Sequence, residues 1–294
     1  MTLQKKATLI SSSVAALLTL IKLIIGIASG SVAVLASAVD SVLDMFVSIF
    51  NYFAISNAEK PADKTFNYGR GKIEALASVI EGTIITLSGI FLLYQAIKKA
   101  YTNEISQYLN ISLTVMIISL IITISLVLYL NFVAKKTNNM VIKADALHYK
   151  TDVYTNVAVL VSLVLVNLTG YEIVDAIVGG CIALFIIYSA VELIKDGVLI
   201  LLDRAVDDEI VKGIENIIRT TQKVNTYHLL KTREAGSQTF VEVHLVFDCL
   251  ITLMDAHRTS DKIEEQIKKL DEKRDWVINI HMDPYDDSQV NKEK

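Results

Sequence analysis

The chain contains few of the residues that cross-link small domains or interrupt regular structure. Among its 294 residues are only two cysteines, Cys181 and Cys249, and two prolines. Two cysteines cannot form a disulfide framework, and because the sequence has no CxxC pair a zinc ribbon is excluded. The low proline content argues against long disordered linkers. No HExxH sequence occurs either, so the helical motif of zinc metalloproteases is absent.

Charged residues are also scarce, and they are unevenly placed. They make up 20% of the chain with a net charge of −4, which excludes a generally basic nucleic-acid-binding protein. Hydrophobic residues make up 52% of the sequence, and the mean hydropathy is +0.45. Residues 1–200 carry 27 of the 60 charged side chains, and residues 201–294 carry the other 33. This division predicts a membrane domain, 1–206, followed by a charged domain, 207–294.

The apolar part contains six segments long enough to cross a bilayer, which needs about 20 mostly apolar residues for each helix. The first begins close to the N-terminus, as a signal peptide would. It is longer than the apolar region of a signal peptide, it contains Lys22, and no A-x-A-like cleavage site follows it, so we expect a retained span. The predicted spans are 7–29, 32–56, 76–98, 108–133, 141–166 and 172–196.

The basic residues of the short loops predict how these spans are oriented. In a six-span arrangement only Lys98 and Lys99 lie on one side of the membrane. The other side holds Lys5, Lys6, Lys60, Lys64, Arg70, Lys72, Lys135, Lys136 and Lys143. Because basic loops stay in the cytoplasm, we expect both termini and the charged domain to be cytoplasmic. Two unpaired cysteines suit that reducing compartment.

The charged part has the pattern of a small α+β domain. Apolar residues recur at helical intervals in 208–220 and 256–270, whereas 239–247 alternates like a half-buried strand. Segments 225–233 and 276–282 have the composition of two further strands. The order α-β-β-α-β predicts a ferredoxin-like fold. The fold class is therefore six transmembrane helices followed by a cytoplasmic ferredoxin-like domain.

Two pairs of ionisable residues lie inside the apolar part. Asp40 and Asp44 are four residues apart in the second span, and His148 and Asp152 are four residues apart in the fifth. This spacing places each pair on one face of its helix, about 6 Å apart along the axis. Facing each other, the pairs would offer three carboxylates and one imidazole, a ligand set that suits zinc and tolerates iron, cobalt or cadmium.

These residues also have a less specific interpretation, in which they lie near helix ends and reach water or form ordinary ion pairs. Charges in the membrane are costly, and His148 is the only histidine in the first 200 residues, so the metal site is favoured. Asp145 could orient the His148 ring, although we interpret it as a polar residue at the cytoplasmic end of its span. Glu81 and Lys22 are interpreted as interfacial or snorkelling residues.

The remaining histidines all lie in the charged domain and suggest a second metal site. Scattered histidines are usually surface residues, so spacing alone favours that simpler interpretation. His281 and Asp283, however, would lie on the same face of a strand. Such a site would act as a sensor or hold a dimer together, because metal binding can order a domain. The candidate ligands are His228, His244, His257, His281 and Asp283.

Taken together, these motifs resemble the cation diffusion facilitator family over nearly the whole chain. The resemblance rests on the Asp-x-x-x-Asp and His-x-x-x-Asp pairs, six spans and a ferredoxin-like tail, with PADKTFNYGRGKIEAL after the second span and LLDRAVDDE after the sixth. It is strongest to the bacterial zinc and iron efflux branch. It implies a homodimer in a bacterial inner membrane that exports divalent cations from the cytoplasm in exchange for protons.

The resemblance also implies roles for individual residues. The tetrahedral transport site would consist of Asp40, Asp44, His148 and Asp152. Lys72 and Asp203 match positions that form an ion pair near the junction of membrane domain and tail, and Leu147 matches a hydrophobic gate. The binuclear cytoplasmic site of the family would consist of His228, His244, His257, His281 and Asp283.

One stretch departs from the family pattern. In some relatives the loop after the second span holds a further zinc site made of one aspartate and two histidines. Here Asp63 keeps the acid, but Phe66 and Arg70 stand at the histidine positions. Because arginine cannot bind a cation, we expect this loop to lack the site.

Zn²⁺ is therefore the expected substrate and also the expected structural or regulatory ion, and we expect no organic cofactor. The partners are protons, membrane lipid and a second copy of the chain. One alternative is the same fold carrying Fe²⁺ or Mn²⁺, and another is a membrane metal sensor that does not transport. An intramembrane metalloenzyme is disfavoured, because four protein ligands leave no position for an activated water.

Overall fold

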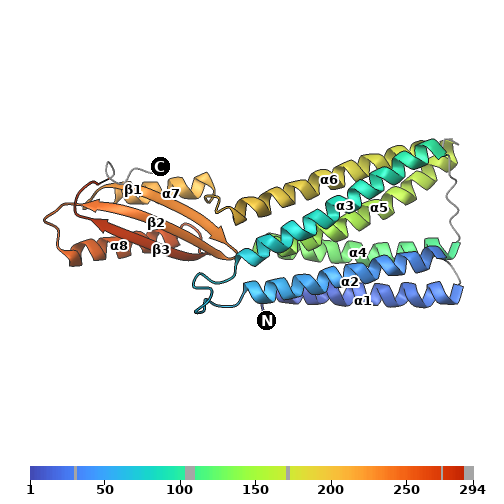
Figure 1. Cartoon of the computed structure of the whole chain (residues 1–294), viewed down its shortest axis with the longest axis horizontal. Helices are drawn as coiled ribbons and strands as arrows, with labels where there is room; N and C mark the ends of the chain where they lie inside the picture. Colours follow the sequence, from blue (N-terminus) through green and yellow to red (C-terminus); the bar gives the residue numbers. More distant parts are fainter. Residues whose placement is uncertain (30–31, 103–109, 170–172, 273, 288–294) are drawn as a thin grey trace. The chain divides into compact units, whose positions relative to one another are not determined.

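The computed structural model describes residues 1–29, 32–102, 110–169, 173–272 and 274–287, which form two compact units, Met1–Val198 and Leu199–Lys294 (Figure 1). The described part of the first unit is built from six long helices, as the sequence predicted. They are α1 (Leu3–Ser29), α2 (Val32–Ala58), α3 (Lys72–Thr102), α4 (Asn110–Thr137), α5 (Met140–Thr169) and α6 (Ile173–Leu201). Most of them extend beyond the predicted apolar windows, because helical hydrogen bonding continues into the polar residues at the ends.

Four of these helices are long and apolar enough, over their described residues, to cross a membrane. The four segments are Leu3–Ile25, Lys72–Lys98, Ile117–Thr137 and Ala176–Leu201. Helices α2 and α5 are of similar length but carry the predicted ligands.

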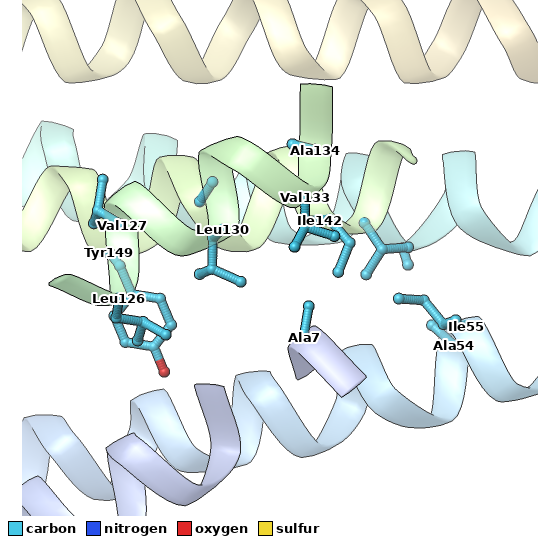
Figure 2. Close-up of a cluster of buried hydrophobic side chains, with 13 residues drawn as sticks. Ala7, Ala54, Ile55, Leu126, Val127, Leu130, Val133, Ala134, Ile142 and Tyr149 are labelled. Atoms are coloured by element: carbon cyan, nitrogen blue, oxygen red, sulfur yellow. The ribbon is translucent and has the colours of Figure 1, made fainter. Parts of the chain in front are cut away.

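A cluster of buried side chains joins α1, α2, α3, α4 and α5 (Figure 2). Ile55, Leu130, Ile142 and Tyr149 are its largest fully buried members. Alanines such as Ala7 lie among them, and small side chains allow helix backbones to approach closely. This packing fixes α2 against α5, the two helices on which the predicted ligands lie.

Helices α3 and α6 also pack closely, in this case at glycines. A Cβ atom added to Gly197 would lie 2.7 Å from Val79 Cγ2, 2.9 Å from Ser78 Oγ and 3.0 Å from the backbone oxygen of Ala75. Ile85, Ile186 and Ala190 form a small buried cluster against which Leu147 packs, so the predicted gate residue is half-buried.

Substitution of Gly197 by alanine is expected to lower the stability of the protein. Overpacking a close contact typically costs about 1–3 kcal/mol. Gly180→Ala in the same helix is the matched control, because no atom lies within 4 Å of a Cβ at that position. Thermal unfolding of the full-length protein should show a lower midpoint for Gly197→Ala only. Equal midpoints for the two variants would contradict close α3–α6 packing.

The second unit has the predicted α-β-β-α-β order. Its elements are α7 (Asp208–Thr220), β1 (Val224–Ala235), β2 (Gln238–Phe247), α8 (Leu253–Lys268) and β3 (Asp275–Asp283). The sheet order is β1-β2-β3, with β1 antiparallel and β3 parallel to β2. A parallel neighbour needs a crossover connection, and α8 provides it. The predicted α+β fold is thus confirmed.

The two faces of this sheet differ in character. Val241, Val243, Leu245 and Phe247 are alternate residues of β2, and they pack in one buried cluster with isoleucines of α7 and α8. Because side chains alternate along a strand, His244 projects to the opposite face, away from these helices. The histidine-bearing face of the sheet therefore does not contribute to the hydrophobic core.

Candidate metal centres

The first candidate centre lies between α2 and α5. Asp44, His148 and Asp152 each offer one ligand atom, and these three atoms lie within 4.8 Å of one another. Nε2 of His148 is 3.0 Å from Oδ1 of Asp44, and the two side chains are 15% and 21% exposed. His148 and Asp152 come from one face of α5 because they are one helical turn apart. The group therefore combines two carboxylates and one imidazole from two helices.

A direct contact fixes the relative position of α2 and α5 beside this group. The hydroxyl groups of Ser48 and Tyr149 share a hydrogen bond of 2.8 Å, and both side chains are buried. Ser48 lies one turn after Asp44, and Tyr149 follows His148 directly. Asp40 stands on α2 one turn before Asp44, and its side chain lies outside the described residues.

The spacing of the group suits a small divalent cation. In a tetrahedral zinc site with bonds of about 2.0–2.2 Å, neighbouring ligand atoms are roughly 3.4 Å apart. The contact of 3.0 Å between His148 and Asp44 and the overall limit of 4.8 Å bracket that separation. The three side chains can thus bind an ion with small shifts, which leaves a fourth position for another ligand.

Two acids close to this group are more deeply buried than the sequence suggested. Glu81 is 1% exposed and Asp145 is 0% exposed. The amide nitrogen of Asn51 donates to both of them, at 3.0 Å to Glu81 and 3.3 Å to Asp145. The interpretation of Glu81 as an interfacial or snorkelling residue is therefore wrong, whereas Asp145 does lie in the second turn of α5 but is enclosed by other helices. Sequence pattern could not reveal this, because the contacts join three different helices.

In the loop between α2 and α3, Asp63 is held by hydrogen bonds and an ion pair. It is the one residue of the loop zinc site of some relatives that this sequence keeps. The backbone N–H groups of Phe66 and Thr65 donate to Oδ1 of Asp63, at 2.9 and 2.8 Å, and Arg70 forms an ion pair with Oδ2. The guanidinium of Arg70 also lies 4.3 Å from the centre of the Phe66 ring. These backbone donors, with Arg70, lower the pKa of the Asp63 carboxyl below its ordinary value. The absence of a metal site in this loop stays a prediction that these contacts support.

The second candidate centre lies on the sheet of the other unit. His228 pairs with His244 in the β1–β2 register, and His244 pairs with His281 in the β2–β3 register. The three histidines form a row across the strands, with ring centres 5.0 and 4.5 Å apart. An irregularity in β1 follows His228, where Leu229 has a φ of 52°. Such irregularities re-aim side chains.

Asp283 connects the members of this row. Its Oδ2 atom lies 2.9 Å from Nδ1 of His244 and 3.6 Å from Nε2 of His228, whereas Oδ1 lies 3.1 Å from Nε2 of His281. A carboxylate with ligands on both sides can bridge two ions. Neither ring nitrogen of the half-buried His228 has a hydrogen bond among the described residues, so the donor set fits a metal ion.

The structure differs from the predicted ligand set at two residues, Asp287 and His257. Nε2 of His228 also lies 3.0 Å from Oδ1 of Asp287. The sequence did not indicate Asp287 as a ligand, because it belongs to no recognisable motif. His257, on α8, has a side chain that is 62% exposed and lies 3.7 Å from Asp261. Within one chain the described structure does not bring His257 into the row, and its role as a ligand stays a prediction.

The predicted ion pair between Lys72 and Asp203 joins residues of different units. Lys72 begins α3, whereas Asp203 belongs to the second unit and lies 3.4 Å from Arg233. The pairing with Lys72 stays a prediction.

Comparison with known proteins covers both units. Residues 8–202 match the family model described as the cation efflux transmembrane domain, and residues 206–285 match the cytoplasmic domain of cation efflux proteins. The chain is 33% identical over 282 residues to the cation-efflux pump FieF of Serratia proteamaculans, a match that covers 96% of this chain and 93% of the relative. The cation-efflux pump FieF of Citrobacter koseri is 34% identical over the same coverage.

The match to a cation efflux transmembrane domain, followed by a match to the cytoplasmic domain of the same proteins, defines a polytopic membrane transporter and not an enzyme. The chain belongs to the cation efflux family, also called the cation diffusion facilitators.

Proposed function

We propose that the protein exports Zn²⁺ from the cytoplasm in exchange for protons. The observation that carries the proposal is the group of Asp44, His148 and Asp152, whose ligand atoms lie within 4.8 Å of one another between two helices of the membrane domain. Asp40 is the proposed fourth ligand. Membership of the cation efflux family supports the direction of transport.

The ligand chemistry supports zinc as the main cargo. An imidazole among carboxylates suits zinc, whereas all-oxygen sites suit manganese. The same ligands accept Fe²⁺, Cd²⁺ and Co²⁺, and Fe²⁺ is the principal alternative cargo. Relatives carry only the name cation-efflux pump, which does not choose among these ions.

Exchange for protons follows from competition at the ligands. Carboxylates and imidazole bind metal only when they are deprotonated, so protons and metal displace each other. A proton gradient directed into the cytoplasm can then drive release of the ion on the outer side. The match to the cytoplasmic domain of the family supports a homodimer, in which the tail row of His228, His244, His281 and Asp283 binds a structural or regulatory zinc ion.

Zinc uptake by sealed vesicles that contain the purified protein tests the proposal. We expect uptake that increases with an imposed pH gradient, together with a change of internal pH as protons move in the opposite direction. Protein-free vesicles provide the control. Zinc binding without uptake would contradict transport and favour a membrane metal sensor, and uptake of Fe²⁺ alone would overturn zinc as the cargo.

A further inference from the structure

A second polar group is enclosed in the first unit, beside the candidate transport site. Asn51 of α2, Glu81 of α3 and Asp145 of α5 are 0%, 1% and 0% exposed. One amide nitrogen, Nδ2 of Asn51, donates to Oε2 of Glu81 and to Oδ1 of Asp145. Both carboxyl groups therefore flank the same amide, although they come from different helices.

The two acids have no permanently charged partner among the described residues, and His148 is the neighbouring group that can carry a positive charge. No lysine or arginine among the described residues forms an ion pair with Glu81 or Asp145. Oε1 of Glu81 and Oδ1 of Asn51 are buried and have no hydrogen-bond partner among the described residues. The hydroxyl groups of Ser11 and Ser48 neighbour Asp145 but carry no charge. Ionised carboxylates are costly to bury, and either protonation or a bound cation removes that cost. A cation would also contact the amide oxygen of Asn51, which protonation of the acids leaves without a partner.

Asn51 and Asp145 lie between the candidate transport site and the end of the helices that is expected to face the cytoplasm. Asp145 lies one turn before His148 on α5, and Asn51 lies two turns after Asp44 on α2, toward the end that leads to the α2–α3 loop. Each residue is therefore displaced from the transport site toward the same end of the helices. Contacts of Lys5 and Thr2 with Glu59 place the N-terminus at that end as well, which is the end expected to face the cytoplasm.

We propose that Asn51, Glu81 and Asp145 form a second binding site for a divalent cation, which the cargo ion occupies between the cytoplasm and the site at Asp44, His148 and Asp152. The ligands are the two carboxylates and the amide oxygen of Asn51, which replaces Nδ2 between the carboxylates when the amide group rotates by 180°. Water completes the coordination. The proposed path rests on the proposed function, but the binding of a cation does not.

The all-oxygen ligand set determines the behaviour of this site. Carboxylate and carbonyl oxygens suit hard ions such as Mn²⁺, and they bind zinc less selectively than a set that includes imidazole. An ion held here exchanges more readily than one bound to His148. A site that releases its ion readily can pass that ion to the stronger site at Asp44, His148 and Asp152.

The binding test uses Mn²⁺ alone as the probe and the full-length protein in detergent. Free Mn²⁺ gives an electron paramagnetic resonance signal that is lost on binding, so bound ions can be counted. We expect Glu81→Gln to bind one Mn²⁺ fewer per protomer than the unsubstituted protein. Glu192→Gln, an exposed glutamate of α6, makes the same chemical change and should leave the count unchanged.

A second variant keeps the test decisive if the first does not fold. Asp145→Asn also preserves size and is expected to remove the same ion, and the elution profile and unfolding midpoint of each variant report folding. An unchanged Mn²⁺ count in a folded variant overturns the proposal and leaves the group a proton-holding or purely structural one.

Zinc uptake by vesicles separates this inference from the proposed function. We expect Glu81→Gln to raise the zinc concentration for half-maximal uptake about ten-fold, the scale of a lost supporting ligand. Loss of one Mn²⁺ from a protein that transports no zinc would uphold the site and overturn the proposed function. Normal uptake with an unchanged Mn²⁺ count would overturn the site alone.

Discussion

Substitution of Asp152 by alanine should abolish zinc transport while the cytoplasmic domain stays folded. Asp152 supplies one of three ligand atoms that lie within 4.8 Å of one another, so its removal leaves Asp44 and His148 as the described ligands of the group. Even residues that only orient a ligand contribute about 10- to 100-fold to metal affinity, so loss of a ligand should reduce uptake about 100-fold or more. Uptake of zinc into sealed vesicles measures the effect.

The matched control for this variant is Asp196→Ala, on the exposed surface of α6 in the same unit. It removes a carboxylate from the membrane domain but not from the candidate site. We expect uptake close to that of the unsubstituted protein. Full zinc transport by Asp152→Ala would disprove the assignment of the transport site, whereas equal losses in the two variants would indicate a general effect on folding.

Substitution of Asp283 by asparagine should remove most of the stabilisation that zinc gives the cytoplasmic domain. Asp283 contacts His244 on one side and His281 on the other, so its two oxygen atoms serve both parts of the row. A ligand that binds only the folded state at 100 times its dissociation constant stabilises that state by about 2.7 kcal/mol. Unfolding of the full-length protein with and without zinc, followed by the fluorescence of Trp276, measures the difference.

Glu242→Gln provides the control for this prediction. Glu242 lies two residues before His244 on β2, and it therefore projects to the same face of the sheet. The two variants make the same chemical change, but only Asp283 contacts the histidines. A zinc-induced shift that survives in Asp283→Asn would exclude this row as the binding site, and a shift lost in both variants would exclude a specific role for Asp283.

The sequence was sufficient wherever the relevant interaction is local. Helical periodicity and hydropathy predicted the six long helices, and alternation in TFVEVHLVF predicted the strand that became β2. The i,i+4 spacing of His148 and Asp152 follows from the pitch of a helix, so their common face needed no tertiary information. The sequence also showed that Arg70 departs from the family pattern, because a positively charged side chain cannot bind a cation.

Contacts between distant segments could not be predicted in this way. The amide of Asn51 contacts Glu81 and Asp145 only because three helices pack together. From the sequence, Glu81 was interpreted as an interfacial residue and Asp145 as a polar residue at the end of its span. The family resemblance had grouped His228, His244 and His281 in one site, but their alignment as a row depends on the register of two strand pairs, one antiparallel and one parallel. A shift of one residue in either register would turn a histidine toward the core.

The sequence by itself determined the membrane class of the chain, the order of its elements and the chemical types of its candidate ligands, because composition and local periodicity are properties of short segments. The tertiary structure alone decided which acids lie buried together, which histidines align and that Asp287 approaches His228. These outcomes depend on the packing of helices and the register of strands, which are set by many weak contacts distributed over the whole chain.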